Sequence, residues 1–138
     1  MTSPKSSVGL VRSPALADSV PYAYAAVTPA GRTVWTAGAC PLDEHGAVVA
    51  PGDVTAQAER VMANLVTALD AAGATLADVA RSTVYVASAD RSDLVAAWDV
   101  VRAAFGDHDA PSTLLGVAVL GYPDQLVEVE AVAVVPET

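Results

Sequence analysis

The run Leu126-Val127-Glu128-Val129-Glu130-Ala131-Val132-Ala133-Val134, close to the C-terminus, carries the clearest β-strand pattern in the chain. Because side chains alternate along a strand, its odd-numbered positions place only valine and alanine on one face. The other face starts with two acids, Glu128 and Glu130, and ends with two valines. This mixture is unusual for a solvated face and favours cover by another layer or another subunit. We therefore expect a sheet with one face in the core and the other in a subunit interface.

The composition is that of one compact domain, and we treat residues 1–138 as a single unit. Apolar residues make up 53% and charged residues 17%, which suggests further buried surface between subunits. The chain has 16 acidic and 7 basic side chains, for a net charge of −9. Because this charge repels phosphate backbones and anionic lipid, we expect neither nucleic acid nor membrane partners.

The cysteine and histidine positions predict no disulfide and no metal site. Cys40 is the only cysteine, and no Cys/His cluster has metal-ligand spacing. Residues 1–19 lack the apolar core of a signal peptide, and no run is long enough to span a bilayer. We therefore expect a cytoplasmic protein.

The spacing of apolar residues predicts the other strands. Residues 1–7 are polar, and we expect them to be flexible. The strands are expected at 8–11, 22–27, 32–37, 81–87, 112–120 and 126–134, with a further short strand at 46–50. The strands at 22–27 and 32–37, joined by the turn Thr28-Pro29-Ala30-Gly31, are expected to form a β-hairpin.

Two helices are also predicted. The first spans 53–72, with an apolar stripe between an N-cap, Asp53, and a C-terminal glycine, Gly73. The second spans 92–105 and has Asp90 or Ser92 as its cap. Right-handed crossovers place both helices on one side of the sheet. The expected fold class is therefore α+β, a mixed sheet with two helices on one face and a second face left bare.

The order and spacing of several short strings resemble the Rid family, also called RidA- or YjgF-like proteins, over nearly the whole chain. The strings are Pro21-Tyr22, Thr36-Ala37-Gly38, Pro41-Leu42, Gly52-Asp53, Ala56-Gln57, Ala71-Ala72-Gly73-Ala74, Asp78-Val79, Ser82-Thr83-Val84-Tyr85-Val86, Pro111-Ser112-Thr113 and the final strand. This resemblance implies a chorismate-mutase-like fold assembled as a homotrimer, with ligand clefts between subunits. It also implies hydrolysis of reactive enamines and imines of amino acids to 2-keto acids and ammonia, without a metal or organic cofactor.

The resemblance also implies a set of site residues. Glu128 matches the glutamate that positions water, and Tyr22 matches the tyrosine near the N-terminus. Ala37 and Gly38 match the backbone turn after the second strand, and Thr113 matches a Cys/Thr position. Pro111 stands where the active members carry an arginine that grips the substrate carboxylate. The chain therefore resembles a divergent subgroup that lacks this arginine.

Other side chains have functional and structural interpretations. Glu128 is either an acid or base in a dry cleft or a hydrogen-bonding group in the interface, whereas Glu130 is expected to be structural. Cys40 is expected to be a small buried thiol, and His45 and His108 are expected to be solvated. The two tryptophans, Trp35 and Trp98, are assigned to core or interface. The arginines that could replace the missing cation, expected to lie on the solvated surface, are Arg12, Arg32, Arg81, Arg91 and Arg102.

Two hypotheses about function remain open. In the first, a homotrimer binds a small, rather apolar imine, enamine or carbonyl compound between subunits, and Glu128 promotes its hydrolysis or tautomerisation. In the second, the trimer binds or senses a ligand without chemistry. The retained glutamate favours the first, and the changes at Pro111 and Ala37 favour the second.

Overall fold

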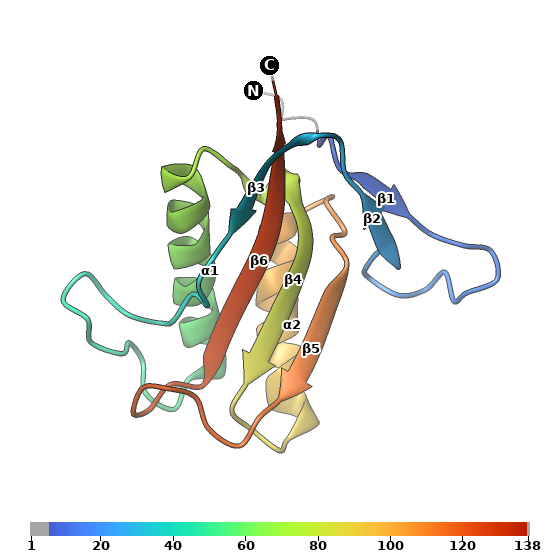
Figure 1. The fold of residues 1–138 in the computed structure, drawn as a ribbon. Helices are drawn as coiled ribbons and strands as arrows, with labels where there is room; N and C mark the ends of the chain where they lie inside the picture. Colours follow the sequence, from blue (N-terminus) through green and yellow to red (C-terminus); the bar gives the residue numbers. More distant parts are fainter. Residues whose placement is uncertain (1–5, 138) are drawn as a thin grey trace.

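The computed structural model describes residues 6–137 (Figure 1). Along the chain the elements are β1 (Gly9–Val11), β2 (Ala25–Val27), β3 (Gly31–Trp35), α1 (Val54–Ala71), the 3-10 turn η1 (Leu76–Asp78), β4 (Val79–Val86), α2 (Arg91–Phe105), β5 (Ser112–Gly116) and β6 (Val127–Pro136). Of the residues expected to be flexible, 1–5 lie outside the described part. Ser6 is held by a hydrogen bond to the carbonyl oxygen of Ala77 at 2.6 Å.

A four-stranded sheet in the order β3-β6-β4-β5 forms one layer, and α1 and α2 cover one of its faces (Figure 1). β4 and β5 run parallel and are joined through α2, whereas β6 runs antiparallel to both of its neighbours. β1 and β2 pair with each other in a separate small sheet. The predicted α+β fold with both helices on one face is confirmed.

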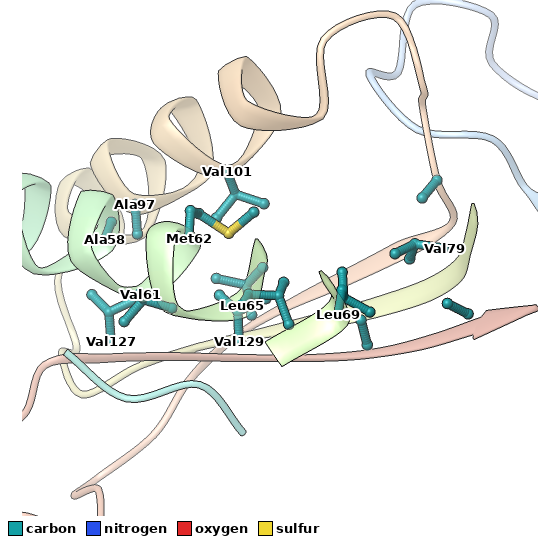
Figure 2. Packing of buried hydrophobic residues seen from close by; sticks show 14 of the residues in the cluster. Ala58, Val61, Met62, Leu65, Leu69, Val79, Ala97, Val101, Val127 and Val129 are labelled. Carbon is teal, nitrogen blue, oxygen red and sulfur yellow. The ribbon is translucent and has the colours of Figure 1, made fainter. Parts of the chain in front are cut away.

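The core lies between α1 and β6. α1 buries Val61, Leu65 and Leu69, which pack toward Val127 and Val129 of β6 (Figure 2). Each such side chain contributes roughly 1.5–3 kcal/mol by leaving water. The assignment of the odd-numbered face of the final strand to the core is therefore confirmed.

Both helices begin at the predicted caps. The Asp53 carboxylate accepts a hydrogen bond from the backbone N–H of Ala56 at 2.9 Å, and α1 ends just before Gly73. In α2 the cap is Asp90, which accepts from the N–H of Ser92 at 2.9 Å. Each side chain satisfies a donor that the first helical turn cannot pair internally.

The second face of the sheet is not covered by a helix, and we call it the open face (Figure 1). Strand register and alternation place on it Trp35 from β3, Arg81, Thr83 and Tyr85 from β4, Thr113 and Leu115 from β5, and Glu128, Glu130 and Val132 from β6. Trp35 is 75% exposed. The open face thus combines exposed apolar side chains with two acids.

The predicted hairpin between residues 22–27 and 32–37 is wrong. β2 pairs with β1, and β3 pairs with β6 in a register that sets Gly31 opposite Pro136. A Cβ atom at Gly31 would lie 2.2 Å from the carbonyl oxygen of Val135, so glycine permits this close crossing of the two chains. Alternation in the sequence predicts a strand, but it does not determine with which other strand that strand pairs.

Two other strand predictions needed correction. The strand expected at 112–120 ends at Gly116, because its neighbour β4 ends at Val86 and offers no further backbone partners. The segment 46–50 forms no strand and contributes one isolated bridge, between Leu42 and Val48. A turn around Asp43 organises this segment instead, through hydrogen bonds from the N–H groups of His45 and Ala47 to its carboxylate.

Candidate active site

Glu128 lies on the open face with its carboxylate directly over Gly38. The connection after β3 approaches β6 through a bridge between Ala39 and Val129, with N···O distances of 2.7 and 3.2 Å. A Cβ atom at Gly38 would lie only 2.3 Å from Oε2 of Glu128. Residue 38 must therefore be glycine for the carboxylate to occupy this position. The structure brings these two predicted site residues together.

Two neutral donors hold the Glu128 carboxylate. The thiol of Cys40 lies 3.2 Å from Oε1 of Glu128, and the side-chain amide nitrogen of Gln125 lies 3.2 Å from the same oxygen. Gln125 is 4% exposed, and its amide also donates to the carbonyl oxygen of Val127 at 3.2 Å. Glu128, Gly38, Cys40 and Gln125 together form what we call the carboxylate half-site.

The thiol of Cys40 is a weaker acid than a free cysteine. Burial raises its pKa to about 11, and the hydrogen bond to Glu128 and the negative charge of Glu128 add to this effect. The thiol is therefore protonated at neutral pH and available as a donor. The assignment of Cys40 as only a small buried thiol is wrong, because the residue is half-buried and contacts Glu128.

Tyr22 and Thr113 lie near the other edge of the sheet, at the edge strand β5. They line an open pocket of about 430 Å³ at the edge of β5, together with Pro21, Trp98, Ser112 and Leu114. The rings of Tyr22 and Tyr24 meet edge to face, with centroids 5.9 Å apart. The structure therefore brings Tyr22 and Thr113 together, in what we call the hydroxyl half-site.

Arg81 is exposed, as expected for an arginine at a strand start, and it lies on the open face beside Thr113. Its guanidinium donates to Oγ1 of Thr113 at 3.2 Å. Within residues 6–137 it forms no ion pair, although Glu130 lines the same hollow of about 270 Å³. Of the strand residues on the open face, Arg81 alone carries a positive charge.

Glu130 is engaged by a neighbouring strand. The phenolic O–H of Tyr85 donates to Oε1 of Glu130, and this hydrogen bond is the main cause of the raised pKa of Tyr85. This pairing supports the structural role expected for Glu130.

The remaining candidates contribute less. Pro111 is buried, and its carbonyl oxygen accepts from the N–H of Ser82 at 3.0 Å, so its ring does not line the hydroxyl half-site. Ala37 is exposed next to Gly38. His45 is exposed, as expected, but His108 is half-buried and its Nε2 lies 2.7 Å from the carbonyl oxygen of Val79. The expectation of a solvated His108 is thus wrong.

No cluster of three or more His, Cys, Asp or Glu side chains in the described part of the chain is arranged to hold a metal ion. Likewise, within residues 6–137 no helix is long and apolar enough to cross a membrane.

The two half-sites do not meet within one chain. β4 lies between β6 and β5 in the sheet, so roughly 10 Å of sheet width separates the strands that carry Glu128 and Thr113. Sequence reasoning missed Gln125, and it named Arg81 only as one of five arginines that could supply the missing cation. Gln125 sits in a turn with no local signal of burial, and the face on which Arg81 lies depends on the start of β4.

Comparison with known proteins identifies the family of the chain. The family model described as Endoribonuclease L-PSP matches residues 13–135. The chain belongs to this family. Solved structures named for the Rid family and for its member YjgF share the fold, in agreement with the resemblance found in the sequence. YyfB, a conserved Rid-family protein from Yersinia pestis, has a TM-score of 0.87 and 32% identity, covering 94% of this chain and 99% of its own.

Curated members of the family include named deaminases. The 2-iminobutanoate/2-iminopropanoate deaminase of Salmonella typhimurium is 34% identical over 75% of this chain and 80% of its own. The 3-aminoacrylate deaminase RutC of Acinetobacter baylyi is 33% identical over 80% of this chain and 85% of its own. Both names describe small nitrogen compounds that carry a carboxylate.

Proposed function

We propose that this protein hydrolyses a small imine or enamine to a carbonyl compound and ammonia. The observation that carries the proposal is the Glu128 carboxylate, held over Gly38 on an open face and only half-buried. A carboxylate in this setting can accept a proton from an attacking water and return it to a leaving group.

The reaction needs only water and proton transfers. Water adds to the carbon of the protonated C=N group, giving a carbinolamine after it loses a proton to Glu128. The same proton then moves to the nitrogen, and the C–N bond breaks as the hydroxyl group loses its proton to Glu128 and becomes the C=O group. Glu128 passes this second proton to the departing ammonia, so the products are the carbonyl compound and an ammonium ion. An enamine first takes a proton at carbon and becomes the imine. Glu128 ends each cycle in its starting state.

Arg81 supports a substrate that carries a carboxylate. The open face bears two acids and the whole chain has a net charge of −9, so an anion approaching it is repelled unless a cation is present. Arg81 supplies that cation next to the hydroxyl of Thr113. An arginine forms directional, charge-assisted hydrogen bonds to a carboxylate, which the buried Pro111 cannot do.

In the proposed assembly the open faces of several copies meet in a homotrimer, and the carboxylate half-site of one copy faces the hydroxyl half-site of the next. The exposed Trp35 and Leu115 support burial of this face. Such a cleft would exclude bulk solvent while admitting the reacting water, and it would place Arg81 of one copy and Glu128 of the next at opposite ends of a small ligand.

Cleavage of RNA, which the family description names, is a weaker candidate for this chain. A net charge of −9 disfavours binding to a phosphate backbone, because nucleic acid affinity depends on neutralising phosphates with basic side chains. The alternative is a non-catalytic trimer that binds a ligand in the same cleft. The experiment below distinguishes this alternative from the enzyme.

The test is release of pyruvate from 2-iminopropanoate generated by an amino-acid oxidase, with and without the protein. We expect acceleration that Glu128→Gln abolishes, because the amide cannot take the proton. Glu59→Gln on the exposed side of α1 is the matched control and should retain full activity. If neither this imine nor an uncharged imine is hydrolysed faster, the protein is not an enzyme of this class.

The role of Arg81 is tested separately with Arg81→Gln. Loss of a charge-assisted hydrogen bond of about 1.5–3 kcal/mol should raise KM for 2-iminopropanoate roughly ten- to hundredfold. KM for an imine without a carboxylate should change little. Arg32→Gln, which removes an exposed arginine of β3, is the control. Equal effects of Arg81→Gln on both substrates would contradict a role in binding the anion.

A further inference from the structure

The two oxygens of Glu128 have different surroundings. Cys40 and Gln125 both point at Oε1, each at 3.2 Å. Oε2 faces Gly38 and accepts no hydrogen bond from residues 6–137. Within the same part of the chain, no buried side-chain oxygen or nitrogen lacks a partner, so Oε2 keeps contact with solvent. One oxygen is therefore held by the protein and the other is left open.

Gln125 is fixed in the orientation that serves Glu128. Its Oε1 accepts from the backbone N–H of Tyr122 at 3.1 Å, which identifies the other end of the amide as the donor. The two hydrogens of that nitrogen go to the Val127 carbonyl and to Glu128. Because the residue is only 4% exposed, a change of rotamer would break these three hydrogen bonds without replacing them by water.

The backbone on both sides of Gln125 is anchored to α1. Gln57, fully buried, accepts from the N–H of Leu126 at 2.8 Å and donates to the carbonyl oxygen of Asp124 at 2.9 Å. Asn64 donates to the carbonyl oxygen of Cys40 at 2.9 Å. These contacts hold the segments that carry Gln125 and Cys40 against the same helix.

We propose that Gln125 and Cys40 are positioning residues, which hold Oε1 of Glu128 so that Oε2 alone exchanges protons with water and substrate. The statement that Oε2 alone exchanges protons with substrate rests on the proposed hydrolysis. The statement that Gln125 and Cys40 hold Oε1 concerns the carboxylate itself and can be tested without turnover. Neither donor touches the substrate position above Gly38, so neither is a catalytic residue.

Titratable groups reach Glu128 from three segments: Cys40 from the connection after β3, Tyr85 from β4 and Glu130 from β6 itself. Tyr85 is hydrogen-bonded to Glu130, so Cys40 is the one of these groups that donates to Glu128. Removing a donor from an ionised carboxylate favours its protonated form. Loss of either donor should therefore shift protonation of Glu128 to higher pH.

The direct test is carbon NMR of the Glu128 carboxyl group as a function of pH. In Cys40→Ala and in Gln125→Met the midpoint should move upward by about half a unit to one unit, and Cys40→Ser, which keeps a donor, should restore it. Ser82→Ala removes a buried hydroxyl that pairs with Ser112 and does not touch Glu128, so it should leave the midpoint unchanged. Circular dichroism shows that each variant is folded.

Activity provides the second readout. With 2-iminopropanoate, kcat should fall about tenfold in Cys40→Ala and the acidic limb of the rate profile should move with the NMR midpoint, whereas KM changes little. Unchanged midpoints in folded Cys40→Ala and Gln125→Met would overturn the proposal. A moved midpoint without hydrolysis by the wild-type protein would instead overturn the proposed function and leave the positioning roles supported. If Gln125→Met does not fold, the comparison of Cys40→Ala with Cys40→Ser tests the proposal.

Discussion

At the scale of single residues, the approach of Gly38 to Glu128 is the tightest constraint in the candidate site. A methyl group at position 38 would meet Oε2 and the rest of the carboxyl group at 2.3–2.8 Å, well inside van der Waals contact. The glycine and the acid are therefore one unit, and a change at either position alters the other.

Substitution of Gly38 by alanine should displace the Glu128 side chain. We expect a loss of hydrolysis of at least a hundredfold and a destabilisation of about 1–3 kcal/mol from overpacking. The destabilisation should largely disappear in Glu128→Ala, because the clashing atoms are gone. Gly121→Ala is the control, since nothing lies within 4 Å of the added methyl group. Urea unfolding and pyruvate release measure the two effects, and additive destabilisation in the double variant would contradict the clash.

Cys40 makes folding stability depend on pH. Because the pKa of its thiol is raised from 9.0 to about 11 in the folded chain, the unfolded chain ionises first. The stabilisation from the protonated thiol is complete below about pH 9 and is lost as pH rises toward 11. The difference in free energy of unfolding between wild type and Cys40→Ala should therefore shrink between pH 8 and pH 10.5. Tyr85 is present in both proteins, so its contribution to the pH dependence cancels. A constant difference would contradict the raised pKa of the Cys40 thiol.

At the scale of elements, α1 does more than cover the sheet. Its buried stripe packs on β6, while its polar side chains Gln57, Arg60 and Asn64 bind backbone carbonyls of the loops around the carboxylate half-site. The apolar spacing in the sequence predicted the first role. Polar side chains on a helix carry no indication of which loop they will meet, so the second role was visible only in the folded chain.

Asn64→Leu should loosen the loop that carries Cys40. The variant removes the hydrogen bonds from the Asn64 amide to the carbonyl oxygens of Cys40 and Leu42, which should cost about 1–3 kcal/mol in unfolding free energy and lower kcat. Thr67→Ala, one turn further along α1, removes only an exposed intrahelical hydrogen bond and serves as the control. Thermal unfolding and steady-state kinetics test both variants. A stability loss without any change in kcat would show that the loop does not depend on Asn64 for its position.

At the scale of the whole molecule, the open face is the feature that one chain leaves unexplained. It displays Trp35, Leu115 and Val132 beside Arg81 and two acids, and it separates the two half-sites by the width of β4. A homotrimer joined through this face would bury the apolar side chains and complete the cleft.

Trp35→Asp should break such an assembly. A buried tryptophan at an interface typically contributes 2 kcal/mol or more, and a carboxylate in its place adds a desolvation cost. We expect light scattering to give a trimer mass for the wild type at micromolar concentration and a monomer mass for the variant. Val95→Asp on the exposed side of α2 should keep the wild-type mass. A monomeric wild-type protein would contradict assembly through the open face.

The amino-acid sequence was sufficient to predict both helices, most of the strands and the core-facing side of β6. The spacing of apolar residues located both helices, their caps and the core side of β6, because those patterns follow from local geometry. The strings around Gly38, Thr113 and Glu128 also identified the family. Local patterns did not predict that β3 pairs with β6 rather than with β2, because strand pairing depends on backbone groups far apart in the chain.

Tertiary structure alone decided the surroundings of Glu128 and of Arg81. Cys40 and Gln125 are 85 residues apart in the sequence. Both donate to the same oxygen of Glu128, and side chains of α1 hold the two segments that carry them. The start of β4 and its parallel register with β5 place the exposed Arg81 within hydrogen-bonding distance of Thr113. Contacts of this kind arise from the packing of distant elements, and no spacing within a single segment encodes them.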